Sequence, residues 1–179
     1  MERTLVLIKP DAIERKLIGE IIKRFEQANL KIVALKMLKA TRAKLAKHYV
    51  GTKEYLISLG NKTLSNMKKE EVEKIFGSLD PYKIGKTIRN WLIEYLNNKE
   101  VVAIVLEGEN AVQKVREIVG FTDPSKAAKG TIRGDFGEDS IEKANSEKRA
   151  VRNLVHASGS KEEAEKEILI WFGKNYYEK

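Results

Sequence analysis

The sequence contains no cysteine, only two histidines and only three prolines among its 179 residues. Without cysteine the chain can form neither a disulfide framework nor a thiolate metal site, and two histidines are too few for a histidine-rich site. No apolar run reaches the ~20 residues that span a bilayer, and no apolar signal region precedes the strand-like segment at residues 4–8. These absences argue against a redox, zinc or membrane role, and we expect a cytoplasmic protein.

The charge balance favours a partner that carries phosphate. The formal net charge is +8 at pH 7, which suits either nucleic acid or a nucleotide with several negative charges. Most of the surplus lies before residue 50, where lysine and arginine are interleaved with apolar helix positions and form no single basic block. That distribution is typical of a solvated surface, so we do not expect a nucleic-acid footprint.

The apolar pattern predicts a single domain over residues 1–179. Helical spacing of apolar residues separates four short apolar runs, and with an inserted segment at residues 51–86 removed the order is βαββαβ. This order predicts an α/β fold of the α+β sandwich type, with a ferredoxin-like antiparallel sheet and helices on one face. The predicted strands are residues 4–8, 32–38, 101–106 and 151–155.

Two segments depart from that pattern. Residues 51–86 contain two short amphipathic stretches, each closed by a glycine, Gly60 or Gly77. We interpret this segment as an inserted helical hairpin, after which a helix resumes at Ile88. Residues 121–147 are rich in glycine, lysine and aspartate with little periodicity. We expect a long loop there, and loops of that length in compact domains are often functional.

One histidine stands between a predicted strand and a predicted helix. His156 follows residues 151–155, and the helix that starts near Ser160 carries Glu167. A neutral imidazole with a pKa of ~6.5 can attack phosphorus near neutral pH, and a carboxylate on the second ring nitrogen selects the nitrogen that stays free. This layout is typical of a residue that forms phosphohistidine. Taken alone, His156 is also consistent with an ordinary strand-end histidine whose hydrogen bonds are satisfied.

A larger group of side chains suits a phosphate pocket. Each member stands at the end of a predicted element or in the long loop. Arginine forks around phosphate oxygens, lysine adds a point charge, and hydroxyl and amide groups fix the orientation of the ligand. Individually, each member also has a structural interpretation, such as a helix surface charge or a loop hydroxyl. The group consists of Lys9, Tyr49, Arg116, Thr122, Arg133, Asn153 and His156.

These residues lie in motifs that resemble those of the nucleoside diphosphate kinase family. The resemblance covers nearly all of the chain outside the insertion, and the motifs occur in the family's order. The motifs are Glu2-Arg3-Thr4, Ile8-Lys9-Pro10-Asp11, residues 19–26, His48-Tyr49, Glu107-Gly108-Glu109-Asn110, residues 130–136 and Asn153-Leu154-Val155-His156.

The resemblance implies a mechanism and a role for each residue. His156 would take the γ-phosphate of a nucleoside triphosphate such as ATP and pass it to a nucleoside diphosphate, a ping-pong exchange that maintains nucleotide pools. Glu167 and Ser158 would hold its ring. Lys9 and Asn153 would bind the sugar 3′-hydroxyl, and Lys9 would also reach the terminal phosphate. The other contacts would be to phosphates, from Tyr49, Arg116, Thr122 and Arg133, and to the base, from Ile88 and Leu92.

The resemblance also implies partners. Mg²⁺ would bridge phosphate oxygens of the nucleotide with little direct ligation by the protein, and several bases would be accepted. The chain would form a homo-oligomer, preferably a hexamer, with residues 121–147 as a subunit-contacting loop. Two alternatives stay open. One is a regulatory protein of the same fold that binds nucleotide or nucleic acid, and the other is a structural domain that uses the insertion as its contact surface.

Three features depart from the family's pattern. Ala157 and Gly159 stand where the family usually has glycine and aspartate, which predicts a displaced start of the last helix. Ile88 stands where the family has an aromatic residue that stacks on the base, so Trp91 and Tyr82 are alternative stacking residues. The third feature is the insertion, which we expect near the base pocket or in a subunit contact.

Overall fold

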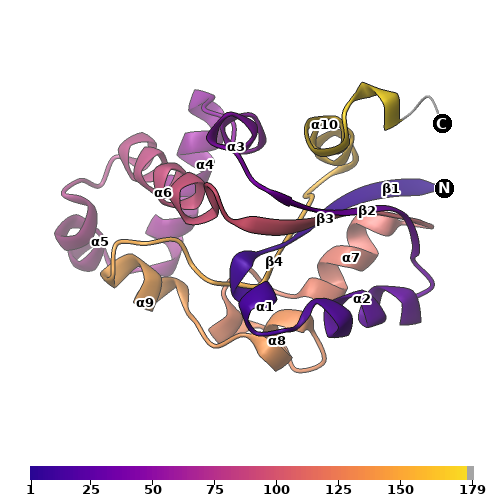
Figure 1. The fold of residues 1–179 in the computed structure, drawn as a ribbon. Helices are drawn as coiled ribbons and strands as arrows, with labels where there is room; N and C mark the ends of the chain where they lie inside the picture. Colours follow the sequence, from indigo (N-terminus) through magenta and orange to yellow (C-terminus); the bar gives the residue numbers. More distant parts are fainter. Residues whose placement is uncertain (177–179) are drawn as a thin grey trace.

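The computed structural model describes residues 1–176, and a four-stranded antiparallel sheet forms its centre (Figure 1). Neighbouring strands follow the order β2-β3-β1-β4. This is the order of a ferredoxin-like βαββαβ sheet, and it confirms the predicted fold class. The strands are β1 (Glu2–Ile8), β2 (Lys31–Lys39), β3 (Glu100–Gly108) and β4 (Val155–Ala157).

Helices cover both faces of this sheet, which corrects the expectation of helices on one face (Figure 1). Successive side chains of a strand point to opposite faces. Val6 and Ile8 therefore join one apolar cluster, while Leu5 and Leu7 join another. Because both faces of β1 are apolar, each face needs its own cover.

The two sets of covering helices come from different parts of the chain. On the face of Val6 and Ile8, residues from four helices complete the apolar cluster: α1 (Pro10–Glu14), α2 (Ile18–Gln27), α7 (Ala111–Val119) and α8 (Ile132–Phe136). On the opposite face the cluster is completed by α3 (Arg42–His48), α6 (Pro81–Leu96) and α10 (Lys161–Phe172). The last of these helices brings Glu167 and Trp171 over the strand that carries His156.

Strand β4 differs from its predicted position. The expectation of a strand at residues 151–155 is wrong, because pairing begins only at Val155 and places His156 inside the strand, opposite Leu7. Leu154 has a left-handed backbone (φ 70°) and its N–H donates to Asp11 Oδ2 at 2.9 Å. Leu154 is therefore held by this side-chain contact and by a single backbone hydrogen bond from the Lys9 N–H at 2.8 Å, outside the strand pairing. The apolar composition of residues 151–155 concealed this, because a short apolar run does not report backbone conformation.

The insertion forms two helices, α4 (Lys53–Asn66) and α5 (Lys69–Phe76). Helix α5 ends at Gly77 in the left-handed conformation, as predicted. The expectation that Gly60 closes a helix is wrong, since α4 continues through it. Helix α6 also begins earlier than Ile88, at Pro81, where Asp80 caps it.

Gly60 has a packing role where α4 crosses α6. A Cβ atom on Gly60 would lie 2.0 Å from the backbone oxygen of Pro81, and one on Gly85 would lie 1.8 Å from the backbone oxygen of Leu56. Both glycines let the two helix backbones approach closely, because they have no side chain to separate them.

The expected loop at residues 121–147 is ordered and contains short helical segments. These are η1 (Pro124–Lys126), α8 and α9 (Ile141–Ser146), and η2 (Lys174–Tyr176) follows α10 near the end of the described chain. Figure 1 shows α9 beside the insertion helices, and Asn145 on α9 donates its side-chain amide to Met67 Sδ at the end of α4, at 3.1 Å. Among residues 1–176, every helix is too short or too polar to cross a membrane.

Candidate active site

His156 lies at the centre of a short chain of polar contacts. Its Nε2 is 2.8 Å from Glu167 Oε1, and Ser158 Oγ donates to Glu167 Oε2 at 2.5 Å. The backbone N–H of Leu5 in turn donates to Ser158 Oγ at 3.3 Å, which ties the serine to the central strand β1. Since a carboxylate accepts hydrogen bonds, Nε2 of His156 carries the proton. The nitrogen left free for attack is therefore Nδ1.

The electrostatic environment keeps this imidazole neutral. Burial lowers the pKa of His156, the charge of Lys9 lowers it further, and Glu163 acts in the opposite direction. Burial raises the pKa of Glu167, against the influence of His48 and Ser158. A buried carboxylate with a raised proton affinity is a strong acceptor for the Nε2–H of His156. A neutral imidazole with a free Nδ1 is the form that can act as a nucleophile.

Lys9 and Asn153 form a buried pair beside the histidine. Lys9 Nζ donates to Asn153 Oδ1 at 2.7 Å, and Asn153 Nδ2 donates to the backbone oxygen of Thr122 at 2.9 Å. Burial, together with the charge of Arg133, lowers the pKa of Lys9 to about 8, although Asp11 opposes the shift. The ammonium group therefore sits close to its titration point, and an anionic ligand would favour its charged form.

Arg133 is fixed by three backbone oxygens. Its Nε donates to Asn153 at 3.1 Å, Nη1 to Gly120 at 3.0 Å and Nη2 to Val155 at 2.6 Å. Burial and then the charge of Arg116 lower the pKa of Arg133 to about 10, so it is still charged at pH 7. This arginine ties α8 to the strand of His156. Because a guanidinium has five N–H groups, it also keeps capacity to donate to a ligand.

The remaining predicted phosphate ligands surround this core more loosely. Arg116 is exposed on α7 and lines a cavity of about 760 Å³ together with Lys126 and Lys161. Thr122 is exposed, and only its backbone oxygen is engaged with Asn153. In residues 1–176 the Tyr49 hydroxyl is buried with no hydrogen-bond partner, and burial raises its pKa. It therefore keeps its proton and can donate.

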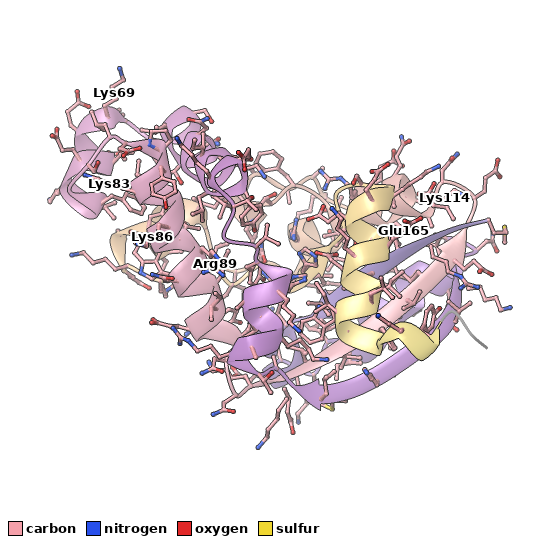
Figure 2. The ribbon with its side chains drawn as sticks, turned by 90° about the horizontal axis from the view of Figure 1, so that it is seen from above. Lys69, Lys83, Lys86, Arg89, Lys114 and Glu165 are labelled. Carbon is pink, nitrogen blue, oxygen red and sulfur yellow. The ribbon has the colours of Figure 1, made fainter. Side chains whose placement is uncertain are left out.

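Helix α6 lies beside Tyr49. Arg89 Nε donates to the backbone oxygen of Tyr49 at 2.6 Å, and Figure 2 shows Lys83, Lys86 and Arg89 in succession along α6. The predicted base contacts, Ile88 and Leu92, are half-buried on the same helix. They are four residues apart and so lie on one face of α6.

The two alternative stacking residues have different surroundings. Trp91 lies with its ring 5.4 Å from that of Phe76 on α5, so part of its surface is used to hold the insertion. Tyr82 is 38% exposed near the start of α6.

The unusual Gly159 makes room for a carboxylate. Helix α10 begins at Lys161 after the N-cap Ser160, whose Oγ accepts from the Glu163 N–H at 3.2 Å. Glu163 Oε2 accepts from the Gly159 N–H at 2.6 Å, and a Cβ on Gly159 would lie 2.6 Å from that oxygen. A negative group in the first turn of a helix interacts favourably with the helix dipole. The substitution therefore accompanies a locally stable helix start.

Sequence reasoning overlooked several residues that shape the site. Asp11 accepts the Leu154 N–H through Oδ2 and the Tyr95 hydroxyl through Oδ1, at 2.9 and 2.8 Å, and so orients the backbone before His156. His48 was noted only as part of a motif, and Trp171 was not considered. The partners of Asp11 lie 143 and 84 residues away, so local patterns carried no signal for them.

The residues of the site fit a cation that is held by the nucleotide better than a Mg²⁺ ion that is held by the protein. His48, His156 and Glu167 place potential ligand atoms within 4.8 Å of one another. Two imidazoles and one carboxylate suit zinc or copper better than Mg²⁺, which prefers oxygen ligands and water. Besides the carboxylate of Glu163, the other charged groups around His156 are the cations Lys9, Arg116 and Arg133. They fit phosphate groups, whose oxygens can themselves hold Mg²⁺.

Comparisons with known proteins assign the chain to a family. The model of the family described as nucleoside diphosphate kinase matches residues 2–56 and 56–177. The chain belongs to the nucleoside diphosphate kinase family. It is 47% identical over 175 residues to nucleoside diphosphate kinase from Pyrobaculum aerophilum, covering 96% of this chain and 95% of the relative. It is 42% identical to that of Pyrococcus furiosus, covering 96% and 83%.

Solved structures from the nucleoside diphosphate kinase family share the fold. The crystal structure of an NDP kinase from Pyrobaculum aerophilum superimposes with a TM-score of 0.92 at 44% identity, covering 98% of this chain and 97% of that one. A nucleoside diphosphate kinase from Borrelia burgdorferi, a transition-state mimic with bound vanadate and ADP, gives a TM-score of 0.77 at 32% identity, covering 98% and 89%.

Proposed function

We propose that this protein transfers the γ-phosphate of a nucleoside triphosphate, typically ATP, to a nucleoside diphosphate through a phosphohistidine at His156. The observation that carries the proposal is the array in which Ser158 and Glu167 hold His156 by Nε2 while three cations surround it. Such a site supplies a nucleophile and charge stabilisation, which are what phosphoryl transfer requires of a protein.

In the first half of the reaction the lone pair of His156 Nδ1 attacks the γ-phosphorus. The bond from that phosphorus to the bridging oxygen breaks, and the diphosphate leaves with the electron pair. The Nε2 proton stays shared with Glu167 throughout. In the second half an oxygen of a new diphosphate attacks the phosphorus, and the N–P bond returns its electron pair to Nδ1. The two halves are each other's reverse, so one site performs both.

The other site residues bind and orient the nucleotide in this proposal. Lys9 and Asn153, already joined at 2.7 Å, would hold the sugar 3′-hydroxyl, and Lys9 would also reach the terminal phosphate. The unpartnered hydroxyl of Tyr49 suits a phosphate oxygen. The remaining assignments are Arg116, Thr122 and Arg133 to the phosphates, and Ile88 and Leu92 to the base.

The family works with a divalent cation, and we infer that it is Mg²⁺. Bound to the phosphates, the ion would neutralise part of their negative charge and so make the phosphorus easier to attack. The protein's cations would neutralise the rest.

We infer that the chain forms a homo-oligomer, preferably a hexamer. Strand β2 lies at the edge of the sheet, and its Leu35 and Met37 are 47% and 49% exposed. Phe121, in the expected subunit-contacting loop, is 53% exposed. An exposed edge strand with apolar side chains favours association. A light-scattering mass near six times the 20.4 kDa of one chain would support the hexamer, and a monomeric mass would contradict association.

We infer that residues 1–179 form one domain in which the insertion at residues 51–86 supports the base side of the site. It packs on α6, which carries Ile88 and Leu92, through the Gly60 and Gly85 crossing. A cytoplasmic location fits the nucleotide substrates. Deletion of residues 51–83 should lower solubility, activity or assembly. A soluble deletion variant with unchanged activity and mass would refute this role.

The decisive experiment uses the pure protein with γ-labelled ATP and Mg²⁺. The proposal expects label that is acid-labile and alkali-stable, that maps to His156 and that GDP removes as GTP. Absence of label in a folded protein that binds nucleotide would overturn the proposal. Salt-sensitive binding of nucleic acid in the same sample would then favour a regulatory protein of this fold.

A further inference from the structure

A second histidine lies directly behind the first. His48 ends α3 and is buried, and its ring centroid is 4.4 Å from that of His156 with the planes at 80°. Its Nδ1 is 3.2 Å from Glu167 Oε1. This is the same oxygen that lies 2.8 Å from His156 Nε2. One carboxylate oxygen is thus approached by both histidines of the chain, and the function proposed above has no role for His48.

A tryptophan approaches the same nitrogen of His48 as Glu167 does. Trp171 is buried on α10, one turn beyond Glu167, and its indole Nε1 is 3.3 Å from His48 Nδ1. An indole nitrogen can only donate a hydrogen bond. To accept it, His48 Nδ1 must present a lone pair, which places the His48 proton on Nε2. That atom is buried and has no hydrogen-bond partner among residues 1–176.

The ring of His48 carries one proton and not two, so only one of its nitrogens can donate. Burial lowers its pKa to about 3, His156 and Lys9 act in the same direction, and Glu167 opposes them. The ring is therefore neutral at pH 7, and it can exist in either of two tautomers. In one, Trp171 donates to Nδ1. In the other, Nδ1 itself carries the proton and can donate to Glu167 Oε1.

We propose that Trp171 is a positioning residue that holds His48 in the Nε2–H tautomer and so reserves Glu167 Oε1 for the Nε2–H of His156. If the proton moved to His48 Nδ1, two imidazoles would compete for one oxygen. The hydrogen bond from His156 Nε2–H to Glu167 would weaken, and part of the His156 population would carry its proton on Nδ1. Protonated Nδ1 has no lone pair for attack on phosphorus. The inference rests on His156 being the nucleophile of the proposed function.

Packing makes this choice of tautomer possible. In the assigned tautomer the His48 lone pair also faces the carboxylate at 3.2 Å, an unfavourable pairing of two acceptors. The ring of Tyr49, 4.6 Å from that of His48, and the indole of Trp171 enclose it. The side chain of His48 is only 1% exposed, so its ring is confined beside Glu167, and the indole N–H is what decides between the tautomers.

The first test reads the tautomers directly. His48 and His156 are the only histidines in the sequence, so the full-length protein labelled with ¹⁵N in histidine has two imidazole signals to assign. Nitrogen shifts distinguish protonated from unprotonated ring nitrogens. The inference expects protonated Nε2 and unprotonated Nδ1 in both rings at pH 7. A protonated Nδ1 on His48 in the unmodified protein would overturn it, whatever any variant does.

The second test is a double-mutant cycle in kcat and KM. Trp171→Phe keeps a ring and removes the N–H. It should lower kcat by about tenfold, which is the loss typical of removing a residue that orients a site residue through a hydrogen bond. KM should stay within about twofold. Adding His48→Leu removes the competing donor. The double variant should therefore recover most of the lost kcat, which a purely structural role of Trp171 would not allow.

The cycle has clear failures. The inference would be overturned if the losses in kcat of the two single variants added in the double variant. It would also be overturned if Trp171→Phe had an unchanged kcat while His48 was shown to be protonated on Nε2. His48→Leu alone removes the unpaired Nε2 but also leaves the Trp171 N–H without its acceptor, so its melting temperature and kcat are measured beside those of the double variant. Failure of the proposed function would instead appear in the unmodified protein, as absence of phosphohistidine.

Discussion

The site around His156 and the inserted helices are held together in different ways. In the site, directional hydrogen bonds join segments far apart in the sequence, as in Lys9 with Asn153 and Arg133 with Val155. The insertion is attached mainly by shape. Its helix α4 lies against α6 through Gly60 and Gly85, and the polar contact of Met67 with Asn145 adds to this packing. Directional bonds fix the positions of individual atoms, whereas close packing fixes the placement of a whole helix.

This contrast predicts two kinds of variant. Changes in the site should reduce activity with little loss of stability, and changes at the glycine crossing should reduce stability before they affect the chemistry. The following predictions test that division, from the largest expected effect to the smallest.

His156→Ala should give the largest effect. It removes the nucleophile, for which the site has no substitute, and should lower exchange by about a factor of 10⁴ or more. The melting temperature should change little, because His156 is partly exposed. Exchange of labelled phosphate between ATP and GDP measures the first quantity and thermal unfolding the second. Turnover near the normal rate in a folded variant would refute the mechanism.

Gly85→Ala should give the largest loss of stability. Its new Cβ would lie 1.8 Å from the backbone oxygen of Leu56, so α4 and α6 must separate. Overpacking of this kind costs about 3 kcal/mol. Gly19→Ala on α2 is the matched control, because nothing lies within 4 Å of its Cβ, and it should stabilise the protein by about 0.5–1 kcal/mol. Urea unfolding measures both, and equal stabilities would contradict the close crossing.

Glu167→Gln should lower the rate of histidine phosphorylation by about 10–100-fold, because a neutral amide accepts the Nε2–H of His156 more weakly than a carboxylate. Stability should be nearly unchanged, since the side chains have the same shape. Glu165→Gln is the matched control. Glu165 is exposed on the same helix, two residues away (Figure 2). Single-turnover labelling measures the rate. Equal rates in both variants would show that Glu167 does not support the phosphorylation of His156.

The smallest effect concerns pH. Burial of Lys9, with Arg133 nearby, lowers its pKa to about 8, so its positive charge is present below that pH and is lost above it. The ratio kcat/KM should therefore fall above pH 8, by up to about tenfold per unit. In the saturated enzyme, phosphates should favour the charged lysine, so kcat should fall at a higher pH. Lys9→Arg, whose pKa is well above this range, should remove the fall. A profile of kcat/KM that is flat to pH 9.5 would contradict the prediction.

The elements of the fold were unequally predictable from the sequence. The strands later found as β1, β2 and β3 were predicted to within two residues at each end, because apolar runs directly reflect burial. The helix end predicted at Gly60 was wrong, since a glycine that allows close approach of two helices resembles a glycine that ends one. The final strand was wrong because Leu154 leaves the sheet through a bond to Asp11, 143 residues away.

For the candidate site, the sequence predicted a set of residues but not how they pair. Lys9, Arg133, Asn153 and His156 were chosen because their chemistry suits phosphate, and the structure brings these four together. Arg133 was expected to hold phosphates, and its bonds to three backbone oxygens were not foreseen.

By itself the sequence determined the fold class and the family and predicted His156 as the nucleophile, because periodicity, residue chemistry and motif order are properties that can be read along the chain. Only the tertiary structure decided which nitrogen of His156 is free, how Trp171 and His48 stand behind Glu167, and where α4 crosses α6. These features depend on the positions of atoms from distant segments, which must be correct to a few tenths of an ångström. No local pattern encodes that precision, since it results from the packing of the whole molecule.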